Sequence, residues 1–342
     1  MTVADLETLG PGDEQAEVPR DSSGKKITGR SPSRIALERL RKDKVAVICS
    51  LICFLMVLAA VLAPVITKIM NIYPTAETIP YQPSDVLDFN TGLPLQGPPN
   101  HGFWSAHPLG LAPTTGVDNL ARLLYGLRTD LLVATIATVL SITVGVVLGL
   151  VAGFSRGWLD RIIMFITDLF LSFPFLLGAL AMAPIITERF GQGNNLDRLA
   201  KAQLIALIVI LTVFGWMGLT RLVRGQVLSL REREFIQAAQ VMGVPTRRIL
   251  FKELLPNLVA PIVVATSLTL PGLVTASAGL AFLGIGVTGI PSLGQTIADA
   301  QIYWSTYPLY LWAPVLTITV LVVALNLVGD SIRDAFDPRT RR

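Results

Sequence analysis

Six long apolar stretches alternate with polar segments along the chain. Each stretch is long enough to cross a bilayer as a helix, which takes about 20 residues. A helix that is apolar on all sides has no face to turn toward water, so it belongs in the interior of a membrane. The pattern therefore predicts an all-α membrane protein with six transmembrane helices, at about 44–67, 129–154, 161–186, 202–222, 258–283 and 309–328.

The polar segments between these helices differ in character. Residues 1–43 are rich in polar residues and Pro and become basic near the first span, which predicts a disordered basic tail with a short helix over 35–43. The tail is long and acidic at its start, and the first apolar run has spanning length, so neither is typical of a signal peptide. Residues 68–128 form a Pro-rich loop, and residues 331–342 form a polar C-terminus.

The distribution of charge orients the predicted helices. Most of the 28 Lys and Arg residues lie in the tail, in a turn at 155–161, in a loop at 223–257 and at the C-terminus. Positively charged loops stay in the cytoplasm. We therefore expect both termini and the 223–257 loop to be cytoplasmic and the 68–128 loop to be extracytoplasmic. Since the basic residues flank membrane spans, the net charge of +4 indicates membrane lipid as a partner and no nucleic acid.

No group of residues typical of a catalytic site stands out, so the chain is not expected to be an enzyme. His101 and His107 lie in the 68–128 loop, where general loop polarity explains them better than a zinc site. Cys49 and Cys53 fall in the first apolar run and indicate packing rather than a disulfide. The phosphate-binding pattern GxxxxGK[ST] is absent. We therefore expect no metal and no cofactor in this chain; a pump that contains it would bind ATP and Mg²⁺ in another subunit.

A few residues inside the spans are candidate gating positions. Asp168 is an intramembrane carboxylate and so a functional candidate by default. The alternative is a helix-end carboxylate that is hydrated or paired with Arg161. Pro271 and Gly272 interrupt the fifth span, either as a hinge or as a static kink. Close helix packing is expected where small residues share one helix face. Three glycines recur at four-residue spacing in the second span: Gly145, Gly149 and Gly153.

The stretch EFIQAAQVMGVPTRRILFKELLP lies between the fourth and fifth spans. Apolar residues recur at helical spacing in 235–242 and again in 247–255, which predicts two short helices. Gly243 is a natural helix stop, and Pro245 suits the first turn of the second helix. Pro256 is expected to end that helix.

This stretch resembles the EAA loop of binding-protein-dependent ABC importer permeases. The family pattern is E-A-A, three residues, G, nine residues, I, one residue and L-P. The matching positions are Ala238, Ala239, Gly243, Leu255 and Pro256. Gln237 stands where Glu is usual, and Glu253 stands where Ile is usual. The resemblance implies a coupling helix that docks in a cleft of an ATPase subunit. Arg247, Arg248 and Lys252 then either meet acidic residues of the ATPase or anchor the loop on the cytoplasmic side.

Further motifs over about 36–339 resemble the oligopeptide/dipeptide/nickel branch of these permeases, of the DppC/OppC type. They read HPLG from His107, RLLYGLRT from Arg122, GWLD from Gly157, DLFLSFPF from Asp168, LAFLGIG from Leu280 and NLVGD from Asn326. Two positions depart from the family: the Arg usual between Gly116 and Asp118 is missing, and Leu293 replaces a common Trp. The resemblance implies a type I ABC importer permease (MetI-like) fold with a transmembrane core at 129–330.

By that resemblance, the chain is a permease subunit of an ATP-driven importer of di- or oligopeptides in the bacterial cytoplasmic membrane. The implied partners are a second permease of the DppB/OppB type, two ABC ATPase subunits of the DppD/DppF type or one fused ATPase, and an extracytoplasmic substrate-binding protein. Nickel is the alternative cargo, although Met and His are sparse in the spans. A channel or secondary carrier that works without ATP is the alternative class, which the scarcity of intramembrane charge disfavours.

Overall fold

The computed structural model describes residues 32–155, 157–190 and 196–336. Within them, all regular secondary structure is helical apart from two isolated β-bridges, so the all-α prediction is confirmed. The disorder predicted for the first 31 residues and the last six residues of the polar C-terminus lie outside the described part of the chain. The short helix expected in the tail is present as α1 (Pro32–Lys42).

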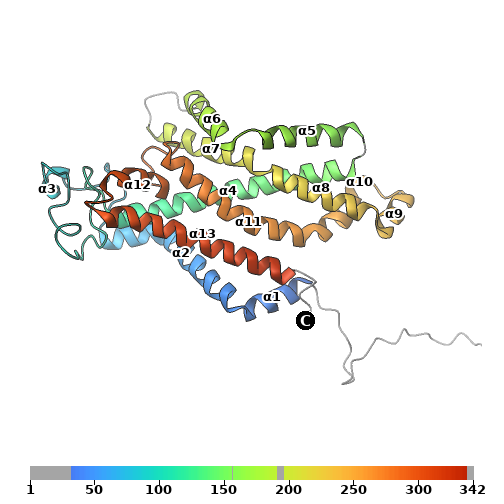
Figure 1. Ribbon diagram of the computed structural model, residues 1–342, viewed down its shortest axis with the longest axis horizontal. Coiled ribbons are helices and arrows are strands. Elements are labelled where there is room, and N and C mark those ends of the chain that lie inside the picture. Colours follow the sequence, from blue (N-terminus) through green and yellow to red (C-terminus); the bar gives the residue numbers. More distant parts are fainter. Residues whose placement is uncertain (1–31, 156, 191–195, 337–342) are drawn as a thin grey trace, which may run out of the picture.

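Five helical stretches are long and apolar enough to cross a membrane, and they run side by side (Figure 1). They are α2 (Lys44–Met70), α4 (Asn119–Phe154), α7 (Leu196–Gly215) with α8 (Met217–Arg231), α11 (Leu255–Phe282) and α13 (Pro308–Phe336). A sixth span is obtained if α5 (Trp158–Ser172) and α6 (Phe175–Phe190) count as one broken helix. This agrees with the six predicted spans in number.

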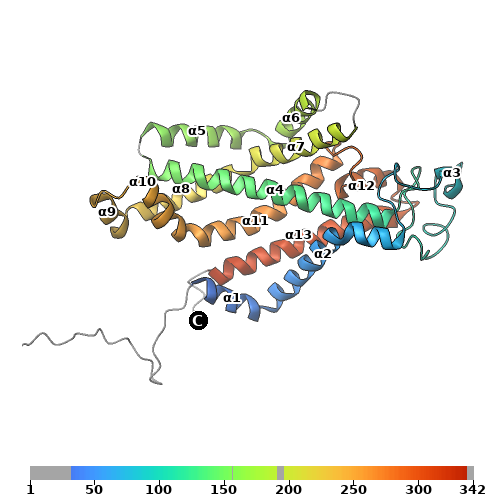
Figure 2. The same cartoon turned by 180° about the vertical axis from the view of Figure 1, so that it is seen from behind.

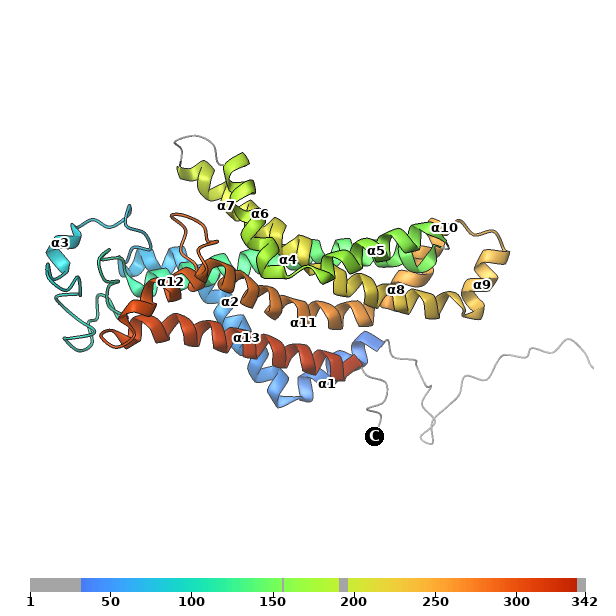
Figure 3. The same ribbon diagram turned by 45° about the horizontal axis from the view of Figure 1, so that its top comes forward.

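The third predicted span is not a single straight helix, because α5 and α6 meet at an angle of 93°. Phe173 lies between them with an extended backbone, at φ −84° and ψ 128°. The ring of the following Pro174 disfavours the helical region for the residue before it. Figure 3 shows α6 and α7 leaning away from the rest of the bundle together, and the two helices pack against each other.

Helix α4 begins at Asn119, well before the span predicted from 129. The side chain of Asp118 starts it, since its Oδ1 accepts a hydrogen bond from the N–H of Ala121 at 2.8 Å. Hydropathy alone missed this first part because Arg122 and Arg128 interrupt the apolar run. The extra turns carry α4 out to the end of the molecule that holds the 71–118 segment (Figure 2).

The 71–118 segment is ordered and packs on the ends of the long helices. It contains α3 (Pro83–Val86) and lies beside α12 (Leu293–Ala300) and the 3₁₀ turn η2 (Gln301–Tyr303). A small apolar cluster joins these parts: Ala112, Val117, Ala300, Tyr307 and Tyr310. The hydroxyl of Tyr307 also donates to the carbonyl oxygen of Leu109 at 2.8 Å. We call this end of the molecule the α3–α12 end.

The main core lies where α4 crosses its neighbours. Fully buried residues from α4, α7, α11 and α13 meet there, including Val133, Ile210, Val274 and Leu321. The outer surface of α2 is apolar as well, with side chains such as Phe54 62% exposed. An apolar surface of this extent suits contact with lipid rather than water.

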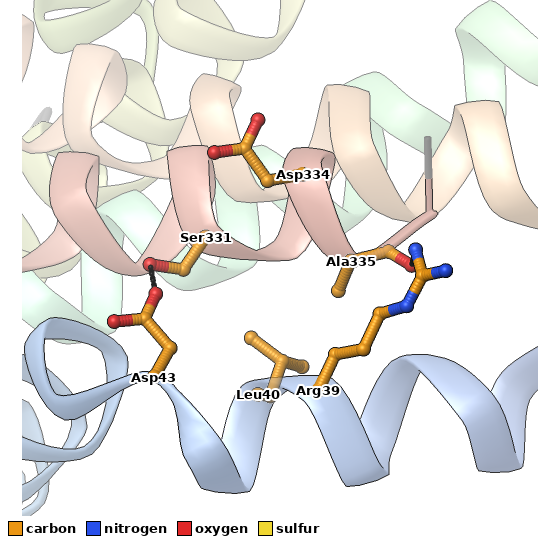
Figure 4. A pocket seen from close by; sticks show the side chains of 6 residues that line it. All are labelled: Arg39, Leu40, Asp43, Ser331, Asp334 and Ala335. Atoms are coloured by element: carbon orange, nitrogen blue, oxygen red, sulfur yellow. Dashed lines mark hydrogen bonds between the residues drawn. The ribbon is translucent and has the colours of Figure 1, made fainter. Parts of the chain in front are cut away.

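Helix α1 is held against the last turns of α13 by polar contacts (Figure 4). The hydroxyl of Ser331 donates to Asp43 Oδ2 at 2.9 Å. The other oxygen of Asp43 accepts from the N–H of Val45 at 2.9 Å and so caps α2. One turn earlier, Arg39 donates to the carbonyl oxygen of Ala335 at 3.3 Å. Asp43 therefore fixes the start of α2 to the end of α13.

Acidification is expected to weaken the contact between α1 and α13, which we call the α1–α13 joint. The hydrogen bond from Ser331 lowers the pKa of Asp43. A carboxyl group with a lowered folded-state pKa stabilises the folded joint above its unfolded pKa of about 3.9, and this contribution disappears as the pH falls through the folded value. We expect Ser331→Ala to speed hydrogen exchange in α1 at pH 7, with the difference from wild type shrinking under strong acid. Thr319→Ala, which removes an exposed hydroxyl within α13, is the control; equal exchange in both variants would contradict the assignment.

Candidate functional site between helices α8 and α11

A short connector, residues 232–254, joins α8 to α11 at the end of the molecule opposite α3 (Figure 1). Its first helix is α9 (Glu234–Val241). After α9, Gly243 has φ +72°, in the left-handed region. The N–H of Val244 then donates back to the carbonyl oxygen of Ala239 at 3.0 Å, which closes the end of the helix. Glycine enters this conformation without strain, so the predicted role of Gly243 as a helix stop is confirmed.

The second half of the connector runs directly into the membrane-spanning helix. Two elements follow the glycine: α10 (Thr246–Arg248), which begins after Pro245, and η1, a π-helix (Ile249–Leu254). The prediction that Pro256 ends this helix is wrong, because α11 continues through it. In the π-helix the N–H of Leu255 donates to the carbonyl oxygen of Leu250, five residues back. This wider turn gives room to the proline ring, which in an α-helix clashes with the carbonyl four residues before it.

One face of the connector is buried against the core helices. The cluster is apolar: Ile236, Ala239, Ile249 and Leu254 pack with Leu150 of α4 and with Leu219, Val223 and Val227 of α8. The position of the connector is therefore set by burial of apolar surface, the main stabilising effect in folding. A rigid-body shift of the connector would move α8 with it.

The opposite face of the connector is exposed and partly apolar. Val241 is 89% exposed and Met242 74%, and the rings of Phe235 and Phe251 are about half exposed. Exposed apolar side chains with basic neighbours are typical of protein interfaces. The basic neighbours are Arg247, Arg248 and Lys252, all exposed.

The predicted coupling residues lie on this connector and at the start of α11. Most of them are exposed: Gln237, Ala238, Gly243, Arg247, Arg248, Lys252 and Pro256. Ala239 is buried in the apolar cluster, while Glu253 and Leu255 are half-buried. Gln237 Nε2 donates to the carbonyl oxygen of Glu232 at 3.3 Å. The residue that replaces the usual Glu therefore makes a local contact to the backbone.

Asp168 pairs with a residue of a different helix from the one expected. Its carboxylate lies 2.6 Å from Arg221 of α8, rather than next to Arg161. About two turns earlier on α5 and one turn later on α8, both oxygens of Asp160 accept from Arg224 at 2.6 and 2.8 Å. The two ion pairs join α5 to α8, the helix that leads into the connector. Asp168 is about half exposed, so its pair contributes little to stability; a role in gating stays a prediction.

Helix α11 passes through Pro271 and Gly272 without a break. Pro271 is buried, whereas no atom beyond the neighbouring residues and backbone of α11 itself lies within 4 Å of the place that a Cβ would take at Gly272. Open space beside the glycine leaves room for bending at this position. The choice between a hinge and a static kink stays a prediction.

The glycines of α4 allow a very close approach of α8, as predicted. A Cβ at Gly149 would lie 2.6 Å from the Cβ of Val223, and one at Gly153 would lie 2.6 Å from the Cβ of Val227. Real Cβ contacts are longer than this, so only glycine fits. Because α8 leads straight into α9, this packing ties the connector to the centre of the bundle.

At the α3–α12 end, His107 is not simply a polar loop residue. Its Nδ1 lies 2.6 Å from Asp118 Oδ2, and both side chains are buried. The ring of Trp104 packs on the His107 ring with centroids 4.4 Å apart. Among the described residues, no group of three or more His, Cys, Asp or Glu side chains could hold a metal ion. The histidine instead orients the carboxylate that caps α4.

Sequence reasoning missed two charged side chains of α4 near this end. Arg122 is buried and donates to Asp299 at 2.6 Å and to the hydroxyl of Tyr310 at 2.8 Å. Asp130 is fully buried and accepts a hydrogen bond from the N–H of Leu293 at 2.9 Å. Its place inside an apolar run was a usable signal. No local signal marked the pair of Arg122, because the partner lies 177 residues away.

Two family models match the chain. One, described as "Binding-protein-dependent transport system inner membrane component", covers residues 145–342. The other, described as "N-terminal TM domain of oligopeptide transport permease C", covers residues 31–98.

Several curated proteins are similar over most of their length. An oligopeptide transport system permease protein OppC of Mycobacterium tuberculosis is 34% identical over 273 residues, which is 80% of this chain and 87% of the relative. A dipeptide transport system permease protein DppC of Alkalihalophilus pseudofirmus is 32% identical over 315 residues, which is 92% of each chain. The OppC of Bacillus subtilis is 30% identical over 321 residues, 93% of each chain.

Among solved structures, an inward-facing form of the MetNI methionine ABC transporter resembles this chain. The TM-score is 0.51 at 24% sequence identity, over 63% of this chain and 96% of the other. This likeness confirms the predicted MetI-like fold.

Proposed function

Since the chain belongs to the binding-protein-dependent transport system inner membrane components, among the permeases of OppC/DppC type, we propose that it lines the path of di- or oligopeptides into a bacterial cell. It is a multi-pass membrane subunit of an ABC transporter and has no catalytic role. ATP and Mg²⁺ bind to its ATPase partners. The names of the relatives as oligopeptide and dipeptide permeases support peptides as the cargo.

The connector between α8 and α11 is the observation that carries this proposal. It presents an exposed face with apolar and basic side chains, and its buried face is fixed to α4 and α8. We infer that this exposed face docks on an ATPase subunit. The connector and both termini then lie in the cytoplasm, and the α3–α12 end faces the binding protein outside. The distribution of basic residues supports the same orientation.

The proposed mechanism is alternating access. Closure of two ATPase subunits, or of a fused pair, on ATP moves the docked connector. Because η1 continues into α11, α11 moves with the connector. Because α8 leads into the connector and packs on α4, α4 moves with it as well. A second permease of the DppB/OppB type completes the path, and the substrate-binding protein delivers the peptide from outside.

Peptide uptake in a strain that lacks this chain tests the proposed function. We offer labelled di-, tri- and pentapeptides and, separately, nickel. Loss of one peptide class, restored by the wild-type gene, is the expected result. Lost nickel uptake with normal peptide uptake would leave the assignment as an ABC importer permease intact. It would overturn the assignment of peptides as the cargo. A chain that purifies from its membrane without any ATPase would instead favour a channel or secondary carrier.

A further inference from the structure

Asp130 is a fully buried carboxylate in the membrane-spanning helix α4, with 1% of its surface exposed. Its Oδ2 accepts a hydrogen bond from the N–H of Leu293 at 2.9 Å. Leu293 is the first residue of α12, and the preceding Ser292 caps that helix. A hydrogen-bond acceptor at a helix N-terminus is favourable, because the first N–H groups lack partners within the helix. The buried carboxylate of α4 therefore holds the start of α12.

The backbone packs closely around this contact. One turn before Asp130, a Cβ at Gly126 would lie 2.9 Å from the backbone nitrogen of Leu293. On the other side, a Cβ at Gly294 would overlap the carbonyl oxygen of Ala278 in α11. The first turn of α12 thus sits between α4 and α11 with no room for a methyl group. Close contacts between backbones leave little freedom for sliding.

A second polar contact fixes the other end of α12 to the same helix. Arg122, two turns before Asp130 on α4, donates to Asp299 in the last turn of α12 at 2.6 Å. The other Nη of Arg122 donates to the hydroxyl of Tyr310 of α13 at 2.8 Å. Helix α12 is therefore attached to α4 at both of its ends.

The opposite half of α4 is attached to the helix that leads into the connector. Gly149 and Gly153 of α4 lie directly against Val223 and Val227 of α8, and α9 follows α8 after a two-residue turn. Helix α4 is thus one continuous helix with α12 at one end and the connector side at the other. A displacement of α8 at the connector would be passed along α4 to α12.

We propose that Asp130 is a positioning residue for transport, which locks α12 to α4 so that both move as one body when the connector moves. The inference rests on the proposed function, since it assigns the α3–α12 end to the outer mouth of the path. In this view, α12 closes or opens that mouth together with α4. Without the acceptor of Asp130, the N–H at the start of α12 would be buried without a partner, which is energetically costly. The contact between α12 and α4 would then weaken.

Two variants of Asp130 distinguish the effect of its acceptor oxygen from the effect of its side-chain volume. Asp130→Asn keeps a side-chain oxygen for the N–H of Leu293, whereas Asp130→Leu has a similar size and no acceptor. We expect Asp130→Leu to lower peptide uptake per ATP hydrolysed by about tenfold or more, and Asp130→Asn to stay close to wild type. The matched control is Thr138→Val, which removes a buried hydroxyl of α4 whose bond lies within the helix.

Distances between spin labels test whether α12 moves with α4. The complete transporter is reconstituted with Cys49 and Cys53 replaced by Ala, and labels are attached at the exposed positions Leu132 of α4 and Gln301 after α12. We expect the same narrow distance distribution without nucleotide and with ATP trapped, and a broad one in Asp130→Leu.

A label distance that changes between the two states in otherwise wild-type protein would overturn the proposal, as would normal coupling in Asp130→Leu. Absence of peptide uptake by the wild-type complex would count against the peptide assignment alone. The label distances in that case still decide whether α12 moves with α4, because they require no substrate.

Discussion

Gly243→Trp is expected to reduce substrate-stimulated ATP hydrolysis to the unstimulated level while the protein still inserts in the membrane. Gly243 has φ +72° and lies on the exposed side of the connector. Apart from Gly243 and its two neighbours in the chain, no residue has an atom within 4 Å of the position that its Cβ would take. A large side chain there does not clash inside the subunit, so it projects from the surface proposed to dock on the ATPase.

Backbone strain has to be separated from bulk in this experiment. For a residue with a Cβ, the left-handed region costs about 1–2 kcal/mol of conformational energy, and Asn tolerates that region best after Gly. Gly243→Asn therefore carries the smallest strain with little bulk, and we expect it to keep most of the stimulated activity. The measurement is ATP hydrolysis by the reconstituted complex with binding protein and peptide, together with the amount of each variant in the membrane. Normal stimulated turnover in Gly243→Trp would remove the assignment of this connector as the coupling segment.

Gly149→Leu is expected to destabilise the subunit strongly. A Cβ at this position would lie 2.6 Å from the Cβ of Val223, 2.8 Å from its Cγ1 and 2.9 Å from the carbonyl oxygen of Thr220. Because two of these atoms are close to the α8 backbone and one belongs to it, the helices themselves must separate. Overpacking of this kind typically costs about 1–3 kcal/mol, and occasionally more. We expect a lower midpoint of thermal unfolding and a smaller yield of assembled transporter.

Gly225 of α8 provides the matched control for this substitution. No atom beyond the neighbouring residues and backbone of α8 itself lies within 4 Å of a Cβ at Gly225, so Gly225→Ala fits without displacement. A helical glycine replaced by alanine at such a place is expected to stabilise by about 0.5–1 kcal/mol. Thermal unfolding of both variants in the same detergent checks the pair. An unchanged midpoint for Gly149→Leu would show that α4 and α8 are not held in this close contact.

Features that depend on neighbours along the chain could be predicted from the sequence. Long apolar runs must become helices inside a membrane, because the backbone has no other way to satisfy its hydrogen bonds there. Gly243 at the end of α9 and the small face of α4 follow from local conformational freedom and helical spacing. The same local rules failed at Pro256, where a π-helix accommodates the ring, and at 161–186, which bends by 93°.

What the sequence determined by itself was the number and approximate place of the apolar helices and the family to which the motifs belong. Only the tertiary structure decided which partners the charged side chains meet. Asp130 reaches Leu293, Arg122 reaches Asp299, and Asp168 reaches Arg221. The partners in each pair come from different helices, so their contact depends on how the helices pack, and no spacing along the chain encodes it. Packing also turned an isolated carboxylate in an apolar run into the residue that holds α12 in place.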